Sequence, residues 1–286
     1  MERAGRVYVA PCGFTYPDGD FRVNVDVSPR WADGQDAYED WGRQYRKDHN
    51  AVPGRMAAVD ASFQDVYEQI PLDGMVLDVA ADIGTLATQA DIDADRYVAV
   101  DTARTDFTKI ERDYPVYARH YARSRHSPFL QANAEFLPIA DLTFDTVHMR
   151  ACLDHFTAPH LALMEAYRVI RGEGSLVVGL ALEGAYQKEN CDWEGLGTQT
   201  GARGLYRSGI GALKEHPKIF NLASRAKALV TREHDHHIFH PTYDAVNGLI
   251  RSCGFEVREE VWPEAYHNVV FLGARKIPGV AARTEG

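Results

Sequence analysis

Apolar residues recur along most of the chain in two alternating patterns, as short runs and at helical spacing. Short apolar runs of strand length occupy Met75–Val79, Tyr97–Val100, Phe129–Ala132, Phe144–Met149 and Ser175–Leu182. Segments with helical spacing lie between them, at Thr85–Ala90, from Thr105–Glu111 onward, and at Pro159–Ile170. Strands that alternate with helices in this way predict a parallel sheet with helices on both faces.

The last part of the chain departs from this alternation. A helix is predicted over Thr242–Cys253, followed by strands at Phe255–Trp262 and Asn268–Arg275 with a short turn around Pro263. Two strands joined by so short a link must be antiparallel. The predicted fold is therefore α/β, a doubly wound seven-stranded sheet, mostly parallel with an antiparallel last strand. The run Gly172–Gly174 is expected to end the helix before the fifth strand.

Residues 1–35 are predicted to be an N-terminal extension. Val7–Val9 and Phe21–Val27 alternate as strands do, and Tyr16–Asp20 between them has turn residues, which together indicate a β-hairpin. The hairpin covers the site, mediates contacts in a homodimer or decorates the fold. Residues 36–276 form the main domain, with a glycine-rich and then helical insertion at 183–233, and residues 277–286 form a polar tail.

The main domain is expected to begin with two helices, which Pro53–Gly54 separates. The second carries Met56, Val59, Phe63, Val66 and Tyr67 at helical spacing. Core packing explains this apolar set, and a helix lying over a cofactor pocket is the alternative.

Composition and charge limit the classes of partner. The formal net charge is -10, whereas a domain that tracks a phosphate backbone usually has a basic face, so no nucleic-acid partner is expected. No apolar run is long enough to span a bilayer, so no membrane partner is expected. The four cysteines are scattered, without a C-x-x-C pair, at Cys12, Cys152, Cys191 and Cys253. This spacing argues against a disulfide framework and a structural zinc site, and a reduced, cytoplasmic setting follows, since Met1–Arg6 has no signal-peptide character.

The stretch Met75–Gly84 organises the rest of the chain. An apolar strand runs into a turn of small residues, and a helix begins directly after it. Backbone N–H groups at such a helix start face a nucleotide-type ligand, and small residues let the ligand approach.

Four stretches in order carry a resemblance to a known family. Val76–Gly84 (V-L-D-V-A-A-D-I-G) resembles its V-L-D-x-G-x-G-x-G motif, and Val98–Asp101 resembles its second strand with a terminal acid. Asn133–Pro138 with Phe144–Val147 resembles D-A-x-x-L-P … F-D-x-V, and Glu165–Gly174 resembles E-x-x-R-V-L-K-P-G-G. The chain thus resembles a class I S-adenosylmethionine-dependent methyltransferase of the small-molecule type, over roughly Tyr38 to Lys276.

The resemblance implies an enzyme with S-adenosyl-L-methionine as cofactor. It would transfer a methyl group to a small-molecule hydroxyl or amine, such as that of a sugar or natural product. A non-catalytic cofactor-binding or assembly protein on the same fold is the alternative. A nicotinamide oxidoreductase is disfavoured by the terminal antiparallel strands and by the lack of G-x-G-x-x-G.

The resemblance also assigns cofactor-binding roles. Asp101, at the end of the second strand, would accept both ribose hydroxyls. Asp78 would lie buried under the turn and organise backbone N–H groups or a water, and Gly84 would permit close helix–strand packing. Arg150, at the end of the fourth strand, would meet the ligand's carboxylate, or else form a surface salt bridge. The adenosine would lie against a further group of residues, Thr102, Asn133, Ala134 and Glu135, with the Asn133 carbonyl oxygen facing the adenine amine.

Ala80 and Asp82 stand where the family has glycine. Alanine tolerates most turn geometries except positive φ. Asp82 places a carboxylate near the ligand's own, which leaves three outcomes: it binds the ligand's ammonium, the cofactor differs slightly, or binding is weakened or lost. The sequence alone predicts that Asp82→Gly leaves folding unchanged and cofactor binding equal or tighter.

Methyl transfer needs alignment and a base, and histidine suits that role because its pKa lies close to neutral. His155, after the fourth strand, is the first candidate, with a ring packed on the next helix as the alternative. His236 belongs to a second group, His234–His237 with His240. This group is a metal site, a base with its orienting acid, or a polar strand, and metal dependence stays open.

Overall fold

The computed structural model describes residues 8–9, 15–16, 42–102, 107–182, 241–263 and 269–279. Its centre is one sheet with strands β3 (Val76–Val79), β4 (Tyr97–Asp101), β5 (Phe129–Gln131), β6 (Phe144–Arg150), β7 (Ile170–Ala181), β8 (Phe255–Val261) and β9 (Val269–Lys276). Their spatial order is β5-β4-β3-β6-β7-β9-β8. Strand β9 runs antiparallel to both β7 and β8, and the pairings among β3 to β7 are parallel. The predicted fold is confirmed.

The order of the strands reverses at β3. The chain continues from β3 to β4 and β5 on one side, then returns to place β6 and β7 on the other. The loops at the carboxyl ends of β3 and β6 therefore diverge, and a crevice opens between them. Ligands of open α/β sheets bind at such a switch point.

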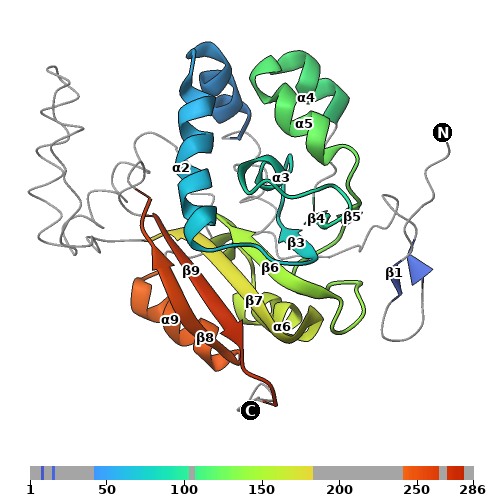
Figure 1. Ribbon diagram of the computed structural model, residues 1–286, viewed down its shortest axis with the longest axis vertical. Coiled ribbons are helices and arrows are strands. Elements are labelled where there is room, and N and C mark those ends of the chain that lie inside the picture. The colour runs from blue at the N-terminus through green and yellow to red at the C-terminus, as the bar shows by residue number, and fades with distance from the viewer. Residues whose placement is uncertain are drawn as a thin grey trace, which may run out of the picture.

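Helices cover both faces of the sheet (Figure 1). One face carries α2 (Arg55–Gln69), α3 (Leu86–Gln89), α4 (Phe107–Asp113) and α5 (Ala118–Ser124). The other face carries α6 (Pro159–Val169) and α9 (Tyr243–Ser252). Short 3-10 turns lie at Pro115–Tyr117 and Leu153–His155, and residues 42–51 are helical. Within the described ranges, no helix is both long and apolar enough to cross a membrane.

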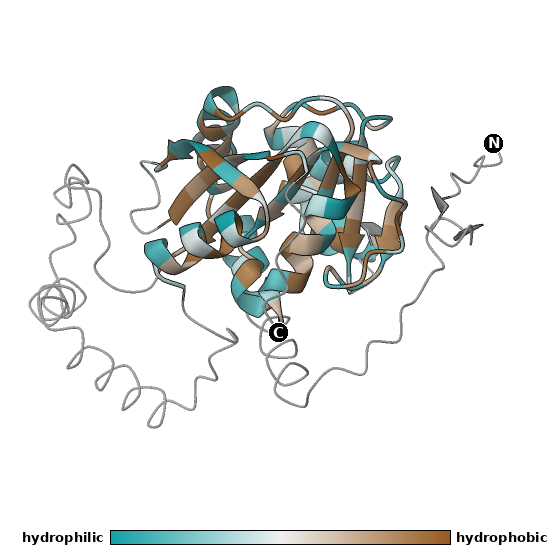
Figure 2. Cartoon of the chain, turned by 90° about the horizontal axis from the view of Figure 1, so that it is seen from below, coloured by the Kyte–Doolittle hydropathy of each residue, from teal (hydrophilic) through white to brown (hydrophobic). Residues whose placement is uncertain are grey.

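The period-2 alternation of strand side chains divides the core in two. Val76 packs with α2 and α3, whereas Leu77 and Val79 pack with the cluster that contains α6 and α9. Both clusters are buried, and Figure 2 shows apolar residues concentrated along the strands. In α2 the predicted apolar positions Met56, Val66 and Tyr67 are buried.

Gly172–Gly174 lies inside β7, so the prediction that it ends the helix was wrong. Helix α6 already ends at Val169, and the next residue, Ile170, has an extended backbone. A Cβ on Gly174 would collide with the backbone carbonyl oxygen of Asp145 on β6. Glycine is required here by the close approach of two strands.

The predicted N-terminal hairpin is found in part. β1 (Tyr8–Val9) pairs antiparallel with β2 (Thr15–Tyr16). Tyr16 is therefore a strand residue, and its placement in the turn was wrong. The predicted second strand Phe21–Val27 lies outside the described residues, as do the insertion at 183–233 and most of the predicted tail.

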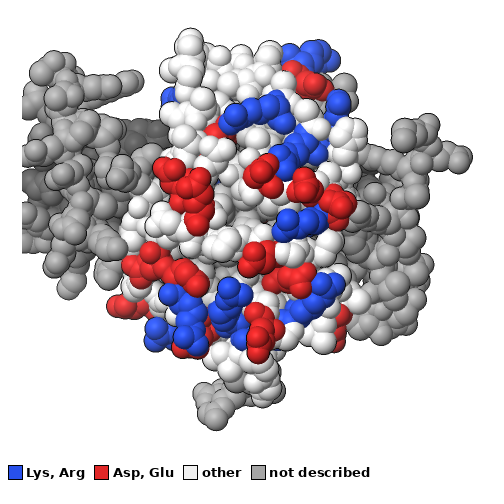
Figure 3. Space-filling model, in the orientation of Figure 1, with Lys and Arg blue, Asp and Glu red and all other residues white. Residues whose placement is uncertain are grey.

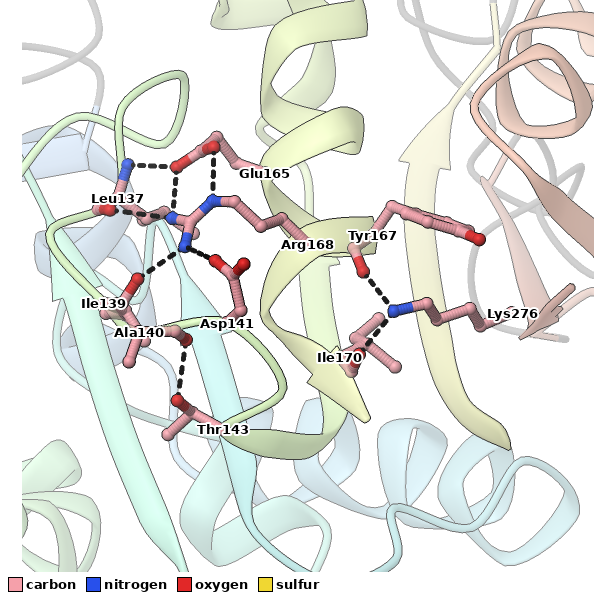
Figure 4. Close-up of polar contacts among 10 residues, drawn as sticks. All are labelled: Leu137, Ile139, Ala140, Asp141, Thr143, Glu165, Tyr167, Arg168, Ile170 and Lys276. Atoms are coloured by element: carbon pink, nitrogen blue, oxygen red, sulfur yellow. Dashed lines mark hydrogen bonds and ion pairs between the residues drawn. The ribbon is translucent and has the colours of Figure 1, made fainter. Parts of the chain in front are cut away.

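The motif residues Glu165 and Arg168 fix the loop between β5 and β6 (Figure 4). Arg168 Nε and Nη2 donate to the Glu165 carboxylate at 2.8 and 2.7 Å. Arg168 also donates to the carbonyl oxygens of Leu137 and Ile139, and Glu165 accepts the Leu137 N–H at 2.7 Å. On the other side of α6, Lys276 Nζ donates to the Ile170 carbonyl at 2.6 Å. The Glu165 and Arg168 contacts therefore fix the loop that leads from β5 to β6, and the Lys276 contact ties β9 to the start of β7.

Candidate cofactor site

A pocket opens at the carboxyl ends of β3, β4 and β5, beside the crevice at the switch point. It holds about 620 Å³ of space, part of it open to solvent. Its lining residues come from the loops after four strands: Val79, Ala80, Val100, Asp101, Thr102, Ala132, Asn133, Ala134, Glu135, Ala151, Cys152, His155 and Phe156. The structure thus brings seven predicted site residues round one pocket: Ala80, Asp101, Thr102, Asn133, Ala134, Glu135 and His155.

The turn after β3 has the backbone of a glycine-rich loop without most of its glycines. Ala80, Asp82 and Gly84 have φ of 57°, 45° and 69°. Ala80 therefore adopts the positive φ that alanine disfavours, so its replacement of a glycine here is not tolerated without strain. A left-handed non-glycine residue costs about 1–2 kcal/mol.

Two hydrogen bonds from the end of β4 hold this turn. The Ala81 N–H donates to the Val100 carbonyl at 3.1 Å, and the Asp82 N–H donates to Asp101 Oδ2 at 2.9 Å. Asp101 is only partly buried and lines the pocket. Its carboxylate therefore fixes the turn while facing the space in which a ligand would lie.

Gly84 permits close packing as predicted, and its nearest neighbours are on helix α5 as well as on strand β4. A Cβ there would lie 2.7 Å from Ser124 Cβ on α5 and 3.3 Å from the Tyr97 hydroxyl. Glycine is needed because α5 approaches the turn so closely.

The loop after β5 uses its own side chains to shape itself. Asn133 Oδ1 accepts the Glu135 N–H at 2.8 Å, and Glu135 Oε1 accepts the Ala158 N–H at 2.5 Å, at the start of α6. Both side chains are buried. The Asn133 carbonyl oxygen, which was predicted to face a ligand, thus also makes an internal contact that shapes this wall.

Asp78 is buried under the turn as predicted, yet its partners are side chains rather than backbone N–H groups. The Tyr97 hydroxyl donates to Asp78 Oδ2 at 2.5 Å, and His148 Nδ1 lies 2.8 Å from Oδ1. His148 Nε2 lies 2.9 Å from the Tyr67 hydroxyl on α2. Burial lowers the pKa of His148, although the hydrogen bond to Asp78 opposes this, and burial raises the pKa of Tyr67 to about 12. Neutral His148 therefore donates to Asp78 and accepts from Tyr67.

Arg150 points to the same buried network, not to the surface. Its guanidinium donates to Thr85 Oγ1 at 2.8 Å, to Gln89 Oε1 at 2.7 Å and to the Tyr67 hydroxyl at 3.2 Å. It also lies 4.3 Å from the centre of the Phe63 ring. The alternative that Arg150 forms a surface salt bridge was therefore wrong. Arg150 is also not among the residues that line the pocket. Arg150 therefore fixes the position of α3 on the sheet through its hydrogen bonds to Thr85 and Gln89.

Asp82 turns toward the helix at residues 42–51. Arg46 Nη1 donates to Asp82 Oδ2 at 3.0 Å, and the side chains are 16% and 40% exposed. The Asp82 carboxylate is thus paired with a cation from the helix at residues 42–51.

His155 is the histidine that faces the pocket within the described chain. It ends the 3-10 turn after β6, is 17% exposed, and its Nε2 lies 3.9 Å from Asp154 Oδ1. The sequence missed its neighbours Cys152 and Phe156, although their position after a parallel strand is itself a signal. Burial raises the pKa of Cys152 well above its ordinary value, so the thiol stays protonated.

His236 and the rest of its histidine group lie outside the described residues. Among the residues that are described, no group of three or more His, Cys, Asp or Glu side chains is placed to hold a metal ion.

Residues 77–178 match the family model described as a methyltransferase domain. This stretch of the chain is therefore a methyltransferase domain. The match spans β3 to β7, and so covers the pocket, the turn after β3 and the Glu165–Arg168 pair. The predicted family is therefore confirmed on the residues that carried the resemblance.

A curated relative matches part of this domain. A ubiquinone/menaquinone biosynthesis C-methyltransferase from Blochmanniella floridana is 44% identical over 50 residues, which are 18% of this chain. The chain spans 20% of the length of that relative.

Two solved structures share the fold of this chain. A methyltransferase from Thermotoga maritima, titled a possible histamine N-methyltransferase, has a TM-score of 0.51 and 18% identity, over 85% of this chain and 99% of its own. The 1,6-didemethyltoxoflavin N1-methyltransferase of Burkholderia thailandensis has a TM-score of 0.51 and 12% identity, over 97% of each chain. At these identities the likeness shows the fold alone.

Proposed function

We propose that this chain transfers a methyl group from S-adenosyl-L-methionine to a hydroxyl or amine of a small molecule. The observation that carries the proposal is the pocket at the switch point, with the Asp101 carboxylate at its edge. The family match over residues 77–178 supports the cofactor class.

The residues present fit an adenosine. A carboxylate at the end of the second parallel strand suits two ribose hydroxyls, and Asp101 has that position. The apolar walls from Val100, Ala132 and Phe156 suit a planar base. Thr102 and Ala134 complete the adenosine part of the pocket.

The bound cofactor supplies a sulfonium-activated methyl group, and the chain's own residues align and deprotonate the acceptor. His155 Nε2 is the group that would accept the proton lost by the acceptor's hydroxyl or amine. The nearby Asp154 carboxylate would favour the protonated ring that forms.

A small acceptor fits the charge of the chain. The net charge is -10, and on the face seen in Figure 3 acidic and basic side chains are interspersed. The structure from Burkholderia thailandensis holds a small heterocycle together with S-adenosylhomocysteine. We infer an uncharged or cationic small molecule as acceptor.

A non-catalytic protein on the same fold is the second candidate, favoured by the strained residues Ala80 and Asp82 at glycine positions. Transfer of label from methyl-labelled cofactor to any acceptor would eliminate it.

Calorimetric titration with S-adenosylhomocysteine tests the proposed cofactor. We expect the wild type to bind, and Asp101→Asn to bind about 10- to 100-fold more weakly, because charge-assisted hydrogen bonds contribute about 1.5–3 kcal/mol. Asparagine keeps an oxygen for the Asp82 N–H, so the turn is retained.

The matched control is Asp93→Asn, whose side chain is 76% exposed and lies outside the pocket lining. It should bind as the wild type does. Absence of binding to the wild type, or equal affinity in Asp101→Asn, would contradict the proposal.

A further inference from the structure

We propose that Tyr67 and Gln89 are positioning residues, which act through a buried hydrogen-bonded network to fix the two strand ends that form one end of the pocket. The inference rests on the proposed function, because this end would hold the part of the cofactor that extends beyond its ribose. Neither side chain is among those that line the pocket, so each acts on a ligand through other residues.

Tyr67 of α2 links β3 to β6 through its hydroxyl. The hydroxyl donates to His148 Nε2 at 2.9 Å, and His148 Nδ1 donates to Asp78 Oδ1 at 2.8 Å. The same hydroxyl accepts from Arg150 Nη1 at 3.2 Å. Asp78 lies on β3, whereas His148 and Arg150 lie on β6. One hydroxyl on a helix therefore joins side chains of both strands.

Gln89 of α3 orients Arg150 from a second helix. Its Oε1 accepts from Arg150 Nη1 at 2.7 Å, and its Nε2 donates to Asp60 Oδ1 at 2.8 Å. The side chain is buried, and the two contacts fix which way the amide points, because only its carbonyl can accept and only its amino group can donate. Gln89 thus sets the direction of the guanidinium, and with it the backbone that leads into Ala151.

The pocket has two ends, which different strands supply. Asp101 and Thr102 of β4 and its loop, with residues 133–135 after β5, form the end assigned above to the adenosine. Ala80 after β3 and Ala151–Cys152 after β6 form the other end, since β3 and β6 are neighbours in the sheet. The sulfur of the cofactor would lie at this second end, because it is joined to the ribose.

The second end contains two strained residues. Ala80 and Ala151 have φ of 57° and 50°, a conformation that alanine disfavours. Such conformations persist only where the surrounding structure holds them. Ala80 comes two residues after Asp78, and Ala151 comes directly after Arg150. The network is therefore placed to hold both strained turns.

The composition of the network suits this role. The Asp60 and Asp78 carboxylates are buried, which costs desolvation free energy that well-packed apolar residues would avoid. Hydrogen bonds are directional, whereas apolar contacts are not. A directional network beneath two strained turns fixes the position of their backbone in a way that apolar packing does not.

Calorimetric titration of the full chain with S-adenosylhomocysteine and with adenosine tests the positioning role. Tyr67→Phe keeps the ring and removes the hydroxyl, so His148 and Arg150 each lose a partner. We expect S-adenosylhomocysteine to bind about 5- to 10-fold more weakly, while the affinity for adenosine changes less than about 2-fold. Gln89→Leu, which removes the partner of Arg150 on the other helix, should show the same pattern.

Hydrogen exchange followed by mass spectrometry locates the change without any ligand. In Tyr67→Phe we expect faster exchange of the amides at residues 80–84 and 151–155, which are the two strained turns and the residues after them. The amides at residues 132–136, in the loop after β5, should exchange as in the wild type.

Tyr167→Phe is the matched control. It makes the same chemical change on α6, where the Tyr167 hydroxyl donates to the Ile277 carbonyl oxygen at 2.8 Å. This variant loses one hydrogen bond far from both strand ends in the sequence and on the other face of the sheet. It should change neither the two affinities nor the exchange of the two turns.

The inference is overturned if a folded Tyr67→Phe variant binds S-adenosylhomocysteine with wild-type affinity. Equal weakening of both ligands, with faster exchange throughout the chain, would overturn it too, because a general loss of stability has that effect. Gln89→Leu decides the question if Tyr67→Phe does not fold. The proposed function survives these results, and fails only if the wild type does not bind S-adenosylhomocysteine.

Discussion

At the scale of single residues, the turn after β3 keeps the backbone conformation of a glycine-rich turn although two of its glycines are replaced. Ala80 and Asp82 take the left-handed conformation that the family motif assigns to glycine. Hydrogen bonds from Ala81 to Val100 and from Asp82 to Asp101 hold the turn in this shape. The conformation therefore survives the loss of two glycines, at the cost of backbone strain.

Ala80→Gly should raise the free energy of unfolding by about 0.5 kcal/mol. Release of about 1–2 kcal/mol of strain outweighs the 0.5–1 kcal/mol by which glycine's greater freedom favours the unfolded chain. Urea unfolding, followed by circular dichroism, measures the change.

Ala81→Gly is the matched control, because Ala81 lies next to Ala80 and is not among the residues with positive φ. It should lose about 1 kcal/mol, from the entropy of glycine and one buried methyl group. An Ala80→Gly variant as unstable as Ala81→Gly would show that Ala80 carries no strain.

The site residues show what a sequence motif reveals and what it leaves out. Asp101 and Ala134 could be predicted because each has a fixed position in a motif, Asp101 as the last residue of β4 and Ala134 shortly after β5. The pairing of Arg46 with Asp82 could not, because the two are 36 residues apart and follow no local pattern. Arg150 was located correctly at a strand end, but its direction depended on Gln89 and Thr85 of another element.

At the scale of elements, a buried contact between a histidine and a carboxylate joins α5 to α2. His120 Nε2 lies 3.3 Å from Asp60 Oδ2, and both residues are almost fully buried. Asp60 also pairs with Arg119 and accepts from Gln89 Nε2 of α3 at 2.8 Å. Burial first, and then the charges of Arg119 and Arg150, lower the pKa of His120 to about 4. Its imidazole is therefore neutral in the folded protein near neutral pH.

This histidine should make the fold sensitive to acid. The unfolded chain binds the proton near the ordinary pKa of 6.5 and the folded chain only near 4, so stability falls as the pH drops between these values. Between pH 7 and pH 5 the contribution of His120 should fall by about 2 kcal/mol. Urea unfolding at the two pH values measures it.

His120→Gln should show a shallower loss than the wild type over that range, whatever its stability at pH 7. His126→Gln, at an exposed position at the end of α5, should keep the wild-type dependence. Parallel pH profiles for the wild type and His120→Gln would disprove this origin of acid sensitivity.

The elements themselves were largely predictable from periodicity. Short apolar runs gave β3 and β6, and helical spacing gave α6 and α9, each to within about two residues. Gly172–Gly174 was misassigned because glycine runs end helices and also permit two strands to approach. Only the neighbouring carbonyl of Asp145, which is known from the structure, distinguishes these reasons.

At the scale of the whole molecule, the candidate cofactor pocket and the buried polar network occupy different parts of the sheet. The pocket lies at the carboxyl ends of the strands, while the network of Asp78, His148, Tyr67 and Arg150 lies under the α2 face. Its members come from three elements that meet only in the fold. A sequence therefore indicates Asp78 as a motif residue but does not reveal its partners.

The fold and the pocket together make one central claim, that S-adenosylmethionine binds at the carboxyl ends of β3, β4 and β5 with its ribose on Asp101. A crystal structure with S-adenosylhomocysteine tests this claim most directly. We predict both ribose hydroxyls within hydrogen-bond distance of the Asp101 carboxylate, and the adenine against Ala134 and Phe156. A ligand bound elsewhere, or one in this pocket that leaves Asp101 without a ribose contact, would contradict it.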